Sequence, residues 1–230
     1  MKPFEVDVVI PARNEAAGIG AVLRKIPPRT VRSVIVVDNG SSDATAAVAE
    51  DEGAVVVREP RVGYGAACLR GMTHVASLPR APDVVVFMVA SGCDDPADIP
   101  NLIRPLRENL FDLVIGSRVL GQAPLNAGQR AGNLVATSLI RAIYGHRYTD
   151  LSSFRAVRFP ALVALGMRDV GYGFLVEMQV KALKTGLRVA ETPVSYRPPP
   201  RKNGVRETVR ESAIAGATAL FQIFRHSTAR

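Results

Sequence analysis

Two polar segments in this sequence have the residue types of a ligand-binding site, and each directly follows a run of valine and isoleucine. The first is Pro-Ala-Arg-Asn-Glu (11–15), and the second is Asp-Asn-Gly-Ser-Ser-Asp (38–43). A carboxylate such as Asp38 can accept hydrogen bonds from the N–H groups of a base or from the hydroxyl groups of a ribose. Gly40, like Gly63 further on, lets the backbone adopt a positive φ or approach a ligand closely. The same residue types also occur in ordinary turns of α/β proteins, so both interpretations stay open at this stage.

The elements that must hold these segments alternate between strand-like and helix-like stretches. Short β-branched runs predict strands at Glu5–Ile10, Ser33–Val37, Ala54–Val57, Asp83–Met88 and Leu113–Ile115. Amphipathic stretches predict helices between them at Ala16–Lys25, Ala44–Glu52, Ala66–Leu78 and Ile99–Asn109. Continuous valine and isoleucine runs are typical of strands that are buried on both faces. The alternation therefore predicts an α/β fold with a mostly parallel central sheet flanked by helices.

Polar loops follow four of these predicted strands, at 11–15, 38–43, 91–96 and 116–118. In open parallel sheets the ligand binds at the carboxyl ends of the strands, where such loops converge. We therefore expect the four loops to surround one site. A dinucleotide fingerprint starting at Gly63 is excluded, because its third glycine and the later acidic partner are missing.

The second half of the chain is more helical. The pattern predicts helices at about Gln129–Tyr144 and Phe174–Thr185, a strand over Arg188–Tyr196, and a final helix from about Glu207 to Arg225. No linker is long enough to separate two domains. We therefore expect residues 1–197 to form one domain, with the basic segment and amphipathic helix of residues 198–230 as part of it.

Further motifs follow the first two segments in a fixed order. They are Gly-Tyr-Gly-Ala-Ala (63–67), Gly-Ser-Arg (116–118), Gln-Arg-x-Gly-Asn (129–133), Thr-Asp-Leu-x-x-x-Arg (149–155), Gly-Phe-x-x-Glu-Met (173–178) and Pro-Val-x-Tyr-Arg (193–197). The ordered set resembles the family 2 glycosyltransferases, which have the GT-A fold of nucleotide-diphospho-sugar transferases. More narrowly it is similar to their polyprenyl-phosphate hexosyltransferase branch, typified by the dolichyl-phosphate mannose and glucose synthases. The resemblance extends from residue 6 to about residue 197.

This resemblance implies transfer of a hexose from a UDP- or GDP-sugar to a polyprenyl phosphate or a related acceptor. The residues that match nucleotide-sugar-binding positions are Pro11, Arg13, Glu15, Asp38, Gly40 and Gly63. Arg118 and Arg130 match positions that hold the acceptor phosphate, for which a planar guanidinium is well suited. A phosphate nucleophile is already ionised and requires no general base. Asp150 and Glu177 match acidic positions near the acceptor or the closing loop, although helix capping or an ion pair would explain them equally well.

The fourth predicted strand departs from the family pattern. There the family carries Asp-x-Asp and often a third polar ligand, which hold Mg²⁺ or Mn²⁺ against the donor diphosphate, and those positions are Val89, Ser91 and Cys93 here. Valine cannot coordinate a metal, a serine hydroxyl is a weak neutral ligand, and a thiol suits softer metals. We therefore assign no metal site, and the ligands for the family's Mg²⁺ or Mn²⁺ are missing. Asp94 is the surviving acidic candidate for a catalytic role, whereas Asp95 precedes Pro96 and is typical of a helix lead-in.

Two functions of different classes remain compatible with this pattern. The first is a hexosyltransferase in which basic side chains replace the electrostatic role of the metal. The second is a non-catalytic nucleotide-sugar-binding or regulatory protein that has lost transfer. Arg201, Lys202 and Arg206 could supply positive charge to a diphosphate, but a solvated basic tail would contain the same residues.

The composition limits the partners and the location. With 29 Lys and Arg against 21 Asp and Glu, the net charge of +8 attracts polyanions, yet no nucleic-acid-binding module is recognisable and no such partner is expected. Cys68 and Cys93 fit neither a disulfide framework nor a zinc site, so we expect free thiols. No apolar run is long enough to span a bilayer. We expect a cytoplasmic protein, with peripheral attachment to the inner face of a membrane left open.

The predicted C-terminal helix carries an apolar stripe at helical spacing. Its members are Val209, Ala213, Ala217, Leu220, Phe221 and Phe224. Basic residues precede the stripe, as they do in helices that lie on an anionic membrane. Packing on the helix's own domain, or at the interface of a homodimer, would produce the same stripe.

Overall fold

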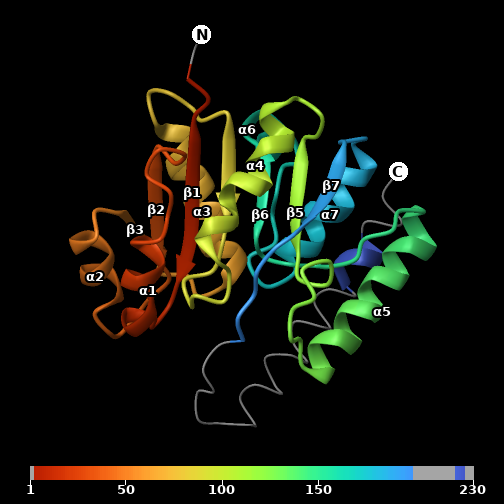
Figure 1. Ribbon diagram of the computed structural model, residues 1–230, viewed down its shortest axis with the longest axis horizontal. Coiled ribbons are helices and arrows are strands. Elements are labelled where there is room, and N and C mark those ends of the chain that lie inside the picture. The colour runs from red at the N-terminus through yellow and green to blue at the C-terminus, as the bar shows by residue number, and fades with distance from the viewer. Residues whose placement is uncertain (1–2, 199–220, 226–230) are drawn as a thin grey trace.

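The computed structural model describes residues 3–198 and 221–225 of the chain and has a mixed sheet with helices on both faces (Figure 1). The sheet has seven strands in the order β3-β2-β1-β4-β6-β5-β7. Its strands are β1 (Val6–Ala12), β2 (Ser33–Asp38), β3 (Val55–Arg58), β4 (Val84–Phe87), β5 (Leu113–Ser117), β6 (Arg155–Arg158) and β7 (Val189–Pro193). All of the strand pairs are parallel except those of β6, so the expected mostly parallel α/β fold is confirmed.

The helices follow the predicted alternation closely. They are α1 (Ala16–Leu23), α2 (Thr45–Asp51), α3 (Tyr64–Ser77), α4 (Ile99–Arg107), α5 (Ala127–Tyr144), α6 (Phe159–Ala164) and α7 (Phe174–Lys184), with a short 3-10 helix at Pro96–Asp98. Asp95 caps that 3-10 helix, because its Oδ1 accepts a hydrogen bond from the backbone N–H of Ala97 at 3.1 Å. The helix lead-in expected for Asp95 is therefore confirmed.

The strand side chains alternate between two hydrophobic layers, which explains the continuous valine and isoleucine runs. Val8 and Ile10 pack in the layer under α1 and α4, whereas Val9 of the same strand packs in the layer under α3 and α7. Both layers are solvent-excluded along the central strands. Because a buried strand has no polar face, a strand such as β1 shows no hydrophobic alternation in its sequence.

The strand order reverses next to β1, and this reversal marks the carboxyl edge of the sheet as the expected place for a ligand. β1 pairs with β2 on one side and with β4 on the other, both in parallel. The loops after β1 and β4 therefore leave the sheet at a topological switch point, where open α/β sheets have their ligand crevice. In Figure 1 the carboxyl ends of these strands point toward the lower edge of the view.

Two elements, β6 and α6, were not predicted. β6 runs antiparallel between β4 and β5, with Arg155 opposite both Phe87 and Ile115. Its sequence is only Arg-Ala-Val-Arg, and two arginines in four residues hide the β-branched signal. β6 takes its place in the sheet by pairing with β4 and β5, and no local sequence pattern predicts it.

The expectations for the C-terminal segment lie mostly outside the described residues. Arg201, Lys202, Arg206 and most of the predicted final helix fall there, and only residues 221–225 of that helix are described. In the described part of the chain, no helix is both long and apolar enough to cross a membrane. Cys68 and Cys93 are both free thiols, as expected.

Candidate functional site

Hydrogen bonds join the loops after β1 and β2 into one rigid rim. The backbone N–H of Asn14 donates to Ser41 Oγ at 3.0 Å, and Asn14 Oδ1 accepts from the backbone N–H of Ser42 at 2.8 Å. The backbone N–H of Glu15 donates to Thr45 Oγ1 at 2.8 Å. Asn14 has a positive φ of 54°, which asparagine tolerates better than most residues. The rim therefore holds the polar loops in a fixed arrangement before any ligand arrives.

A hollow of about 350 Å³ lies beside Asp38 at the carboxyl ends of β2 and β3. Asp38 and Gly40 line it together with Arg58, Glu59 and Pro60. Asp38 Oδ1 accepts a hydrogen bond from the backbone N–H of Ser41 at 3.0 Å, which fixes the side chain of this half-buried residue. The hollow is thus bordered by carboxylates and a guanidinium, which can bind donors and acceptors of a nucleoside.

Arg58 and Glu59 are lining residues that were not predicted. Arg58 is the register partner of Asp38 across the β2–β3 pair, so the two residues end neighbouring strands at the same edge. Both lining residues directly follow the predicted strand Ala54–Val57. The rule that ligands bind at carboxyl ends of parallel strands applies to this loop as well, and it would have identified them.

The other residues predicted to bind the nucleotide sugar take different places around the rim. Pro11 is half-buried in β1 opposite Val37, and Arg13 is exposed in the loop that follows. Glu15 occupies the N-cap position of α1. Burial raises the pKa of the Cys93 thiol, and the negative charges of Asp94 and Glu15 add to this effect. Glu15 is not one of the residues that line the hollow at Asp38.

Gly63 permits a close approach between two segments of the chain itself. A Cβ on Gly63 would lie 2.3 Å from the carbonyl oxygen of Val170, and one on Gly65 would lie 2.1 Å from that of Asp169. The first N–H groups of α3 donate to this same segment, including Ala66 N to the Val170 carbonyl at 2.9 Å. Gly63 therefore has a role in backbone packing, and its expected contact with a ligand stays a prediction.

The loop after β4 does not have the donors of a divalent metal site. Val89 is apolar, and the Ser91 Oγ and Cys93 Sγ atoms are 3.1 Å apart and hydrogen-bonded to each other. Burial raises the pKa of the Cys93 thiol, which disfavours the thiolate that would bind a metal. Among the described residues there is no cluster of three or more His, Cys, Asp or Glu side chains that could hold a metal ion. The residues present do not fit the Mg²⁺ or Mn²⁺ ion of the expected family.

Asp94 faces the protein interior and holds this loop together. Its side chain is buried, and Oδ2 accepts a hydrogen bond from the backbone N–H of Val89 at 3.1 Å. Its backbone forms an isolated antiparallel bridge with Tyr196, and the next residue after Tyr196 donates its N–H to the Cys93 carbonyl at 2.8 Å. The segment after β7 is therefore bound to the loop after β4, and Asp94 lies beneath their junction.

Burial raises the pKa of Asp94, and the stability of the protein therefore depends on pH. Burial, together with the negative charges of Asp150 and Asp98, raises the pKa of Asp94 from 3.8 to about 6, although the Val89 N–H and Arg118 oppose the shift. Because the folded state then binds this proton more tightly than the unfolded state, the contribution to stability falls as pH rises from about 4 to about 6. We expect Asp94→Asn to match the wild type near pH 4 and to be more stable at pH 7, by at most about 3 kcal/mol. Urea unfolding across this pH range measures the difference, and superimposable pH profiles of the two proteins would contradict it.

Arg118 is held by a buried carboxylate rather than extended toward solvent. Asp150 Oδ1 accepts from Arg118 Nη2 at 2.7 Å, and Asp150 Oδ2 accepts from both Arg118 Nε and the Arg118 backbone N–H at 2.8 Å. The guanidinium carbon also lies 5.4 Å from the centre of the Tyr196 ring. Asp150 is fully buried, whereas the Arg118 side chain is 18% exposed. The ion-pair interpretation of Asp150 therefore has direct geometric support.

Arg130 and Glu177 take no part in the hydrogen bonds between Arg118 and Asp150. Arg130 is exposed in the first turn of α5, and Glu177 is buried in α7. Glu177 accepts hydrogen bonds from Lys181 Nζ and from the backbone N–H groups of Arg168 and Asp169. Burial acts to raise the pKa of Glu177, but these bonds outweigh it and lower the pKa overall. Glu177 thus fixes the segment that packs against Gly63 and Gly65.

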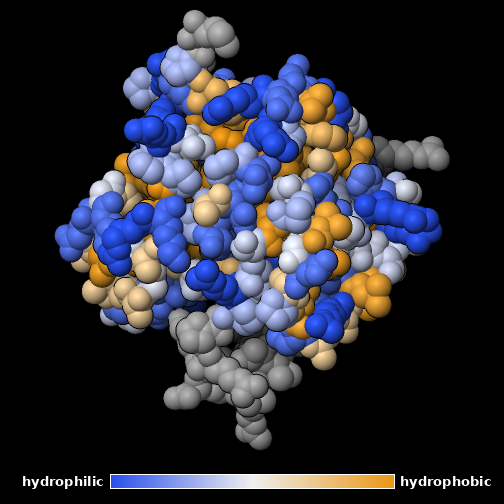
Figure 2. Space-filling model, in the orientation of Figure 1, coloured by the Kyte–Doolittle hydropathy of each residue, from blue (hydrophilic) through white to orange (hydrophobic). Residues whose placement is uncertain are grey.

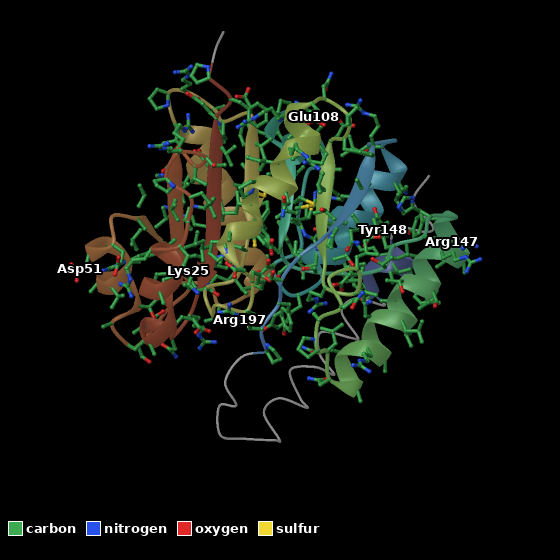
Figure 3. The ribbon with its side chains drawn as sticks, viewed as in Figure 1. Lys25, Asp51, Glu108, Arg147, Tyr148 and Arg197 are labelled. Carbon is green, nitrogen blue, oxygen red and sulfur yellow. The ribbon has the colours of Figure 1, made fainter. Side chains whose placement is uncertain are left out.

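A second cavity of about 190 Å³ borders the loop after β4 on its α1 side. Its lining includes Ser91, Cys93 and Asp94 together with two basic residues, Lys25 and Arg197. Figure 3 shows Lys25, which lies just after the C-terminal end of α1, and Arg197 at the lower edge of the sheet. The cations come from opposite ends of the chain, and they place positive charge beside the positions where the family carries its metal ligands.

Comparisons with known proteins find sequence relatives over most of the chain. The sequence profile of the family described as Glycosyl transferase family 2 matches residues 7–166. An uncharacterized glycosyltransferase of Mycobacterium tuberculosis is 38% identical over 214 residues, which cover 91% of this chain and 94% of the relative. The undecaprenyl-phosphate mannosyltransferase of Micrococcus luteus is 31% identical over 207 residues, with 84% of each chain covered.

Solved structures with a similar fold include glucosyl-3-phosphoglycerate synthase of Mycobacterium tuberculosis. Its complex with phosphoglyceric acid superimposes with a TM-score of 0.77 at 28% identity, covering 95% of this chain and 80% of that one. Its complex with Mn²⁺, UDP-glucose and phosphoglyceric acid gives a TM-score of 0.73 at 27% identity, with 95% and 79% covered.

Proposed function

Since this chain belongs to glycosyl transferase family 2, we propose that it transfers a hexose from a UDP- or GDP-sugar to a polyprenyl phosphate or a related phosphorylated acceptor. The observation that carries the proposal is the hollow beside Asp38 at the carboxyl ends of β2 and β3, in a chain of this family. The mannosyltransferase of Micrococcus luteus supports the lipid acceptor, and the synthase complex with UDP-glucose supports a nucleotide-sugar donor.

On the donor side, the nucleoside would enter the hollow and the diphosphate would extend toward the loop after β4. Asp38, Arg58 and Glu59 would contact the nucleoside, while Pro11, Arg13 and Glu15 would form the rim of the path. Lys25 and Arg197 border the cavity beside Ser91 and would stabilise the diphosphate leaving group by charge-assisted hydrogen bonds. No step is assigned to a metal ion, because the donors at Val89, Ser91 and Cys93 do not suit one.

On the acceptor side, Arg130 would contact the phosphate directly and Arg118 would act from its complex with Asp150. Arg130 is exposed at the start of α5, whereas both oxygens of Asp150 already occupy the Arg118 fork. Arg118 would therefore donate through a remaining N–H group, in an orientation that Asp150 sets. A phosphate oxygen needs no general base to attack the sugar, so the lack of a His–carboxylate pair is no obstacle.

A second candidate function is a non-catalytic nucleotide-sugar-binding or regulatory role. The observation that favours it is the loss of all three metal-ligand positions in the loop after β4.

One series of measurements separates the two functions. Titration calorimetry with UDP- and GDP-sugars is done with and without Mg²⁺ or Mn²⁺, followed by an assay of hexose transfer to a short polyprenyl phosphate. Donor binding that does not depend on the metal, together with turnover, supports the transferase. Donor binding without turnover on lipid and soluble acceptors supports the second function. If neither donor binds, both functions are contradicted.

Restoring two carboxylates tests the alignment of the loop after β4. In the double variant Val89→Asp and Ser91→Asp, the family's Asp-x-Asp pattern returns, and oxygen ligands again suit Mn²⁺. We expect donor affinity to become metal-dependent, with an increase of at least about tenfold on adding Mn²⁺, because the ion neutralises the diphosphate charge. Calorimetry against the wild type measures it. A variant that folds yet shows the same affinity with and without Mn²⁺ would overturn the alignment.

A further inference from the structure

Helix α5 presents an uncharged, largely apolar face to solvent. Its buried residues are Ala136, Thr137 and Ile140. Leu134 and Val135 project from the opposite side and are 67% and 52% exposed. The helical period places Ala131, Ser138 and Ala142 on that side too, and all three are exposed. A helix on the surface of a soluble protein ordinarily carries charged residues there. Figure 2 shows hydrophobic side chains at the lower right, over the position of α5 in Figure 1.

Basic residues border this face, and α5 itself contains no aspartate or glutamate. Arg130 and Arg141 lie along one side of the face, and Arg147 follows the C-terminal end of the helix. Figure 3 shows Arg147 pointing away from the body of the molecule. An apolar face with an arginine border and no carboxylate on the helix is the pattern of a helix that lies in the surface of an anionic bilayer.

A second exposed apolar side chain stands on the segment next to α5. Phe221 is 60% exposed, and its segment is attached to α5 through a hydrogen bond from Tyr144 Oη to the Ile223 carbonyl at 2.8 Å. Phenylalanine is a common residue on the apolar face of helices that lie in the membrane interface. A second exposed apolar side chain is thus present on an element that contacts α5.

We propose that α5 docks this protein onto an anionic lipid bilayer, with Leu134 and Val135 entering the head-group boundary and the arginines contacting lipid phosphates. A second copy of the chain fits the same face less well. In a two-fold symmetric dimer through α5, the arginines of one helix would meet an identical helix that offers no carboxylate. A bilayer with anionic lipids supplies the missing negative charge as well as an apolar layer.

The docking face adjoins the acceptor side of the site. Gln129, in the first turn of α5, donates from Nε2 to Tyr196 Oη at 3.2 Å, and the ring of Tyr196 lies against Arg118. A bilayer that contacts α5 would therefore lie next to Arg130, where a lipid-linked phosphate would enter. This last connection rests on the proposed function, whereas docking itself requires neither donor nor acceptor.

Vesicle sedimentation tests the proposal without any substrate. The full chain is mixed with phosphatidylcholine vesicles that do or do not contain about one third phosphatidylglycerol. We expect the wild type to sediment with the anionic vesicles only. The double variant Leu134→Glu and Val135→Glu should bind at least about tenfold more weakly, because it replaces apolar contacts with two charges that the anionic surface repels. Val163→Glu is a control for a glutamate placed elsewhere on the surface, since Val163 is 56% exposed on α6, and it should leave binding unchanged.

The outcomes are separable from one another and from catalysis. Thermal unfolding of each variant establishes that it is folded before sedimentation is compared. Equal binding of the double variant and the Val163→Glu control would overturn the proposal and point to another surface of the chain. Equal binding to neutral and anionic vesicles would contradict the role of the arginines. A wild type that ignores vesicles but is a dimer by light scattering, and becomes a monomer in the double variant, would assign the face to a second copy instead.

Discussion

Replacing Asp38 with asparagine is expected to weaken binding of UDP- and GDP-sugars by about 10- to 150-fold, the equivalent of the 1.5–3 kcal/mol typical of a hydrogen bond to a charged group. Asp38 borders the hollow at the carboxyl end of β2, where its carboxylate can accept hydrogen bonds from a base or a ribose. Asparagine keeps an oxygen that can still accept the Ser41 N–H, so the turn is retained while the charge is lost. Titration calorimetry measures the change in affinity.

Asp51→Asn is the matched control for this prediction. Asp51 is exposed at the end of α2, before the amino end of β3, whereas the hollow lies at the carboxyl end of that strand (Figure 3). The control removes the same charge from the chain, so it reports any general effect of net charge on an anionic ligand. Donor affinity that falls equally in both variants, or in neither, would mean that the nucleoside does not bind beside Asp38.

The fold could be predicted from the sequence wherever an element carries its own signal. β1 and β2 are valine and isoleucine runs, and their buried positions on both faces require such residues. β6 is different, because Arg155 at its start is fully buried and donates to the carbonyls of Ser152 and Leu175. A buried arginine within a strand is stabilised by tertiary contacts, and no local sequence pattern predicts these contacts.

The candidate site divides in the same way. Asp38 and Gly40 belong to a local motif, and they line the hollow; their contact with a nucleotide stays a prediction. The ion-pair partner of Arg118 is Asp150, which is 32 residues away in sequence. The sequence alone does not show which acidic residue of the chain will lie next to Arg118. The role of a charged residue at the carboxyl edge of the sheet therefore depends on its burial and on its partner. Residue type alone does not distinguish an arginine that binds phosphate from one that forms an ion pair.

The Arg118–Asp150 pair carries the largest expected effect on stability. Asp150→Ala would leave the guanidinium of Arg118 mostly buried without its carboxylate, and it would also remove the acceptor of the Arg118 backbone N–H and one of the two acceptors of the Leu151 N–H. Breaking one side of a buried ion pair costs about 3–5 kcal/mol. For a chain of this size that corresponds to a decrease in Tm of about 6–20 °C. Because Asp150 orients Arg118, we also expect hexose transfer to fall even at temperatures where the variant is folded.

Two further variants distinguish this buried pair from an ordinary surface contact. Glu52→Ala breaks the exposed pair of Glu52 with Arg24, and such pairs contribute little, so its Tm should change far less. The double variant Arg118→Met and Asp150→Ala removes both charges and should recover part of the stability that Asp150→Ala loses, because no unpaired cation remains. If the double variant is less stable than Asp150→Ala by the full effect of Arg118→Met alone, the two side chains do not interact energetically, and the orientation of Arg118 cannot depend on Asp150.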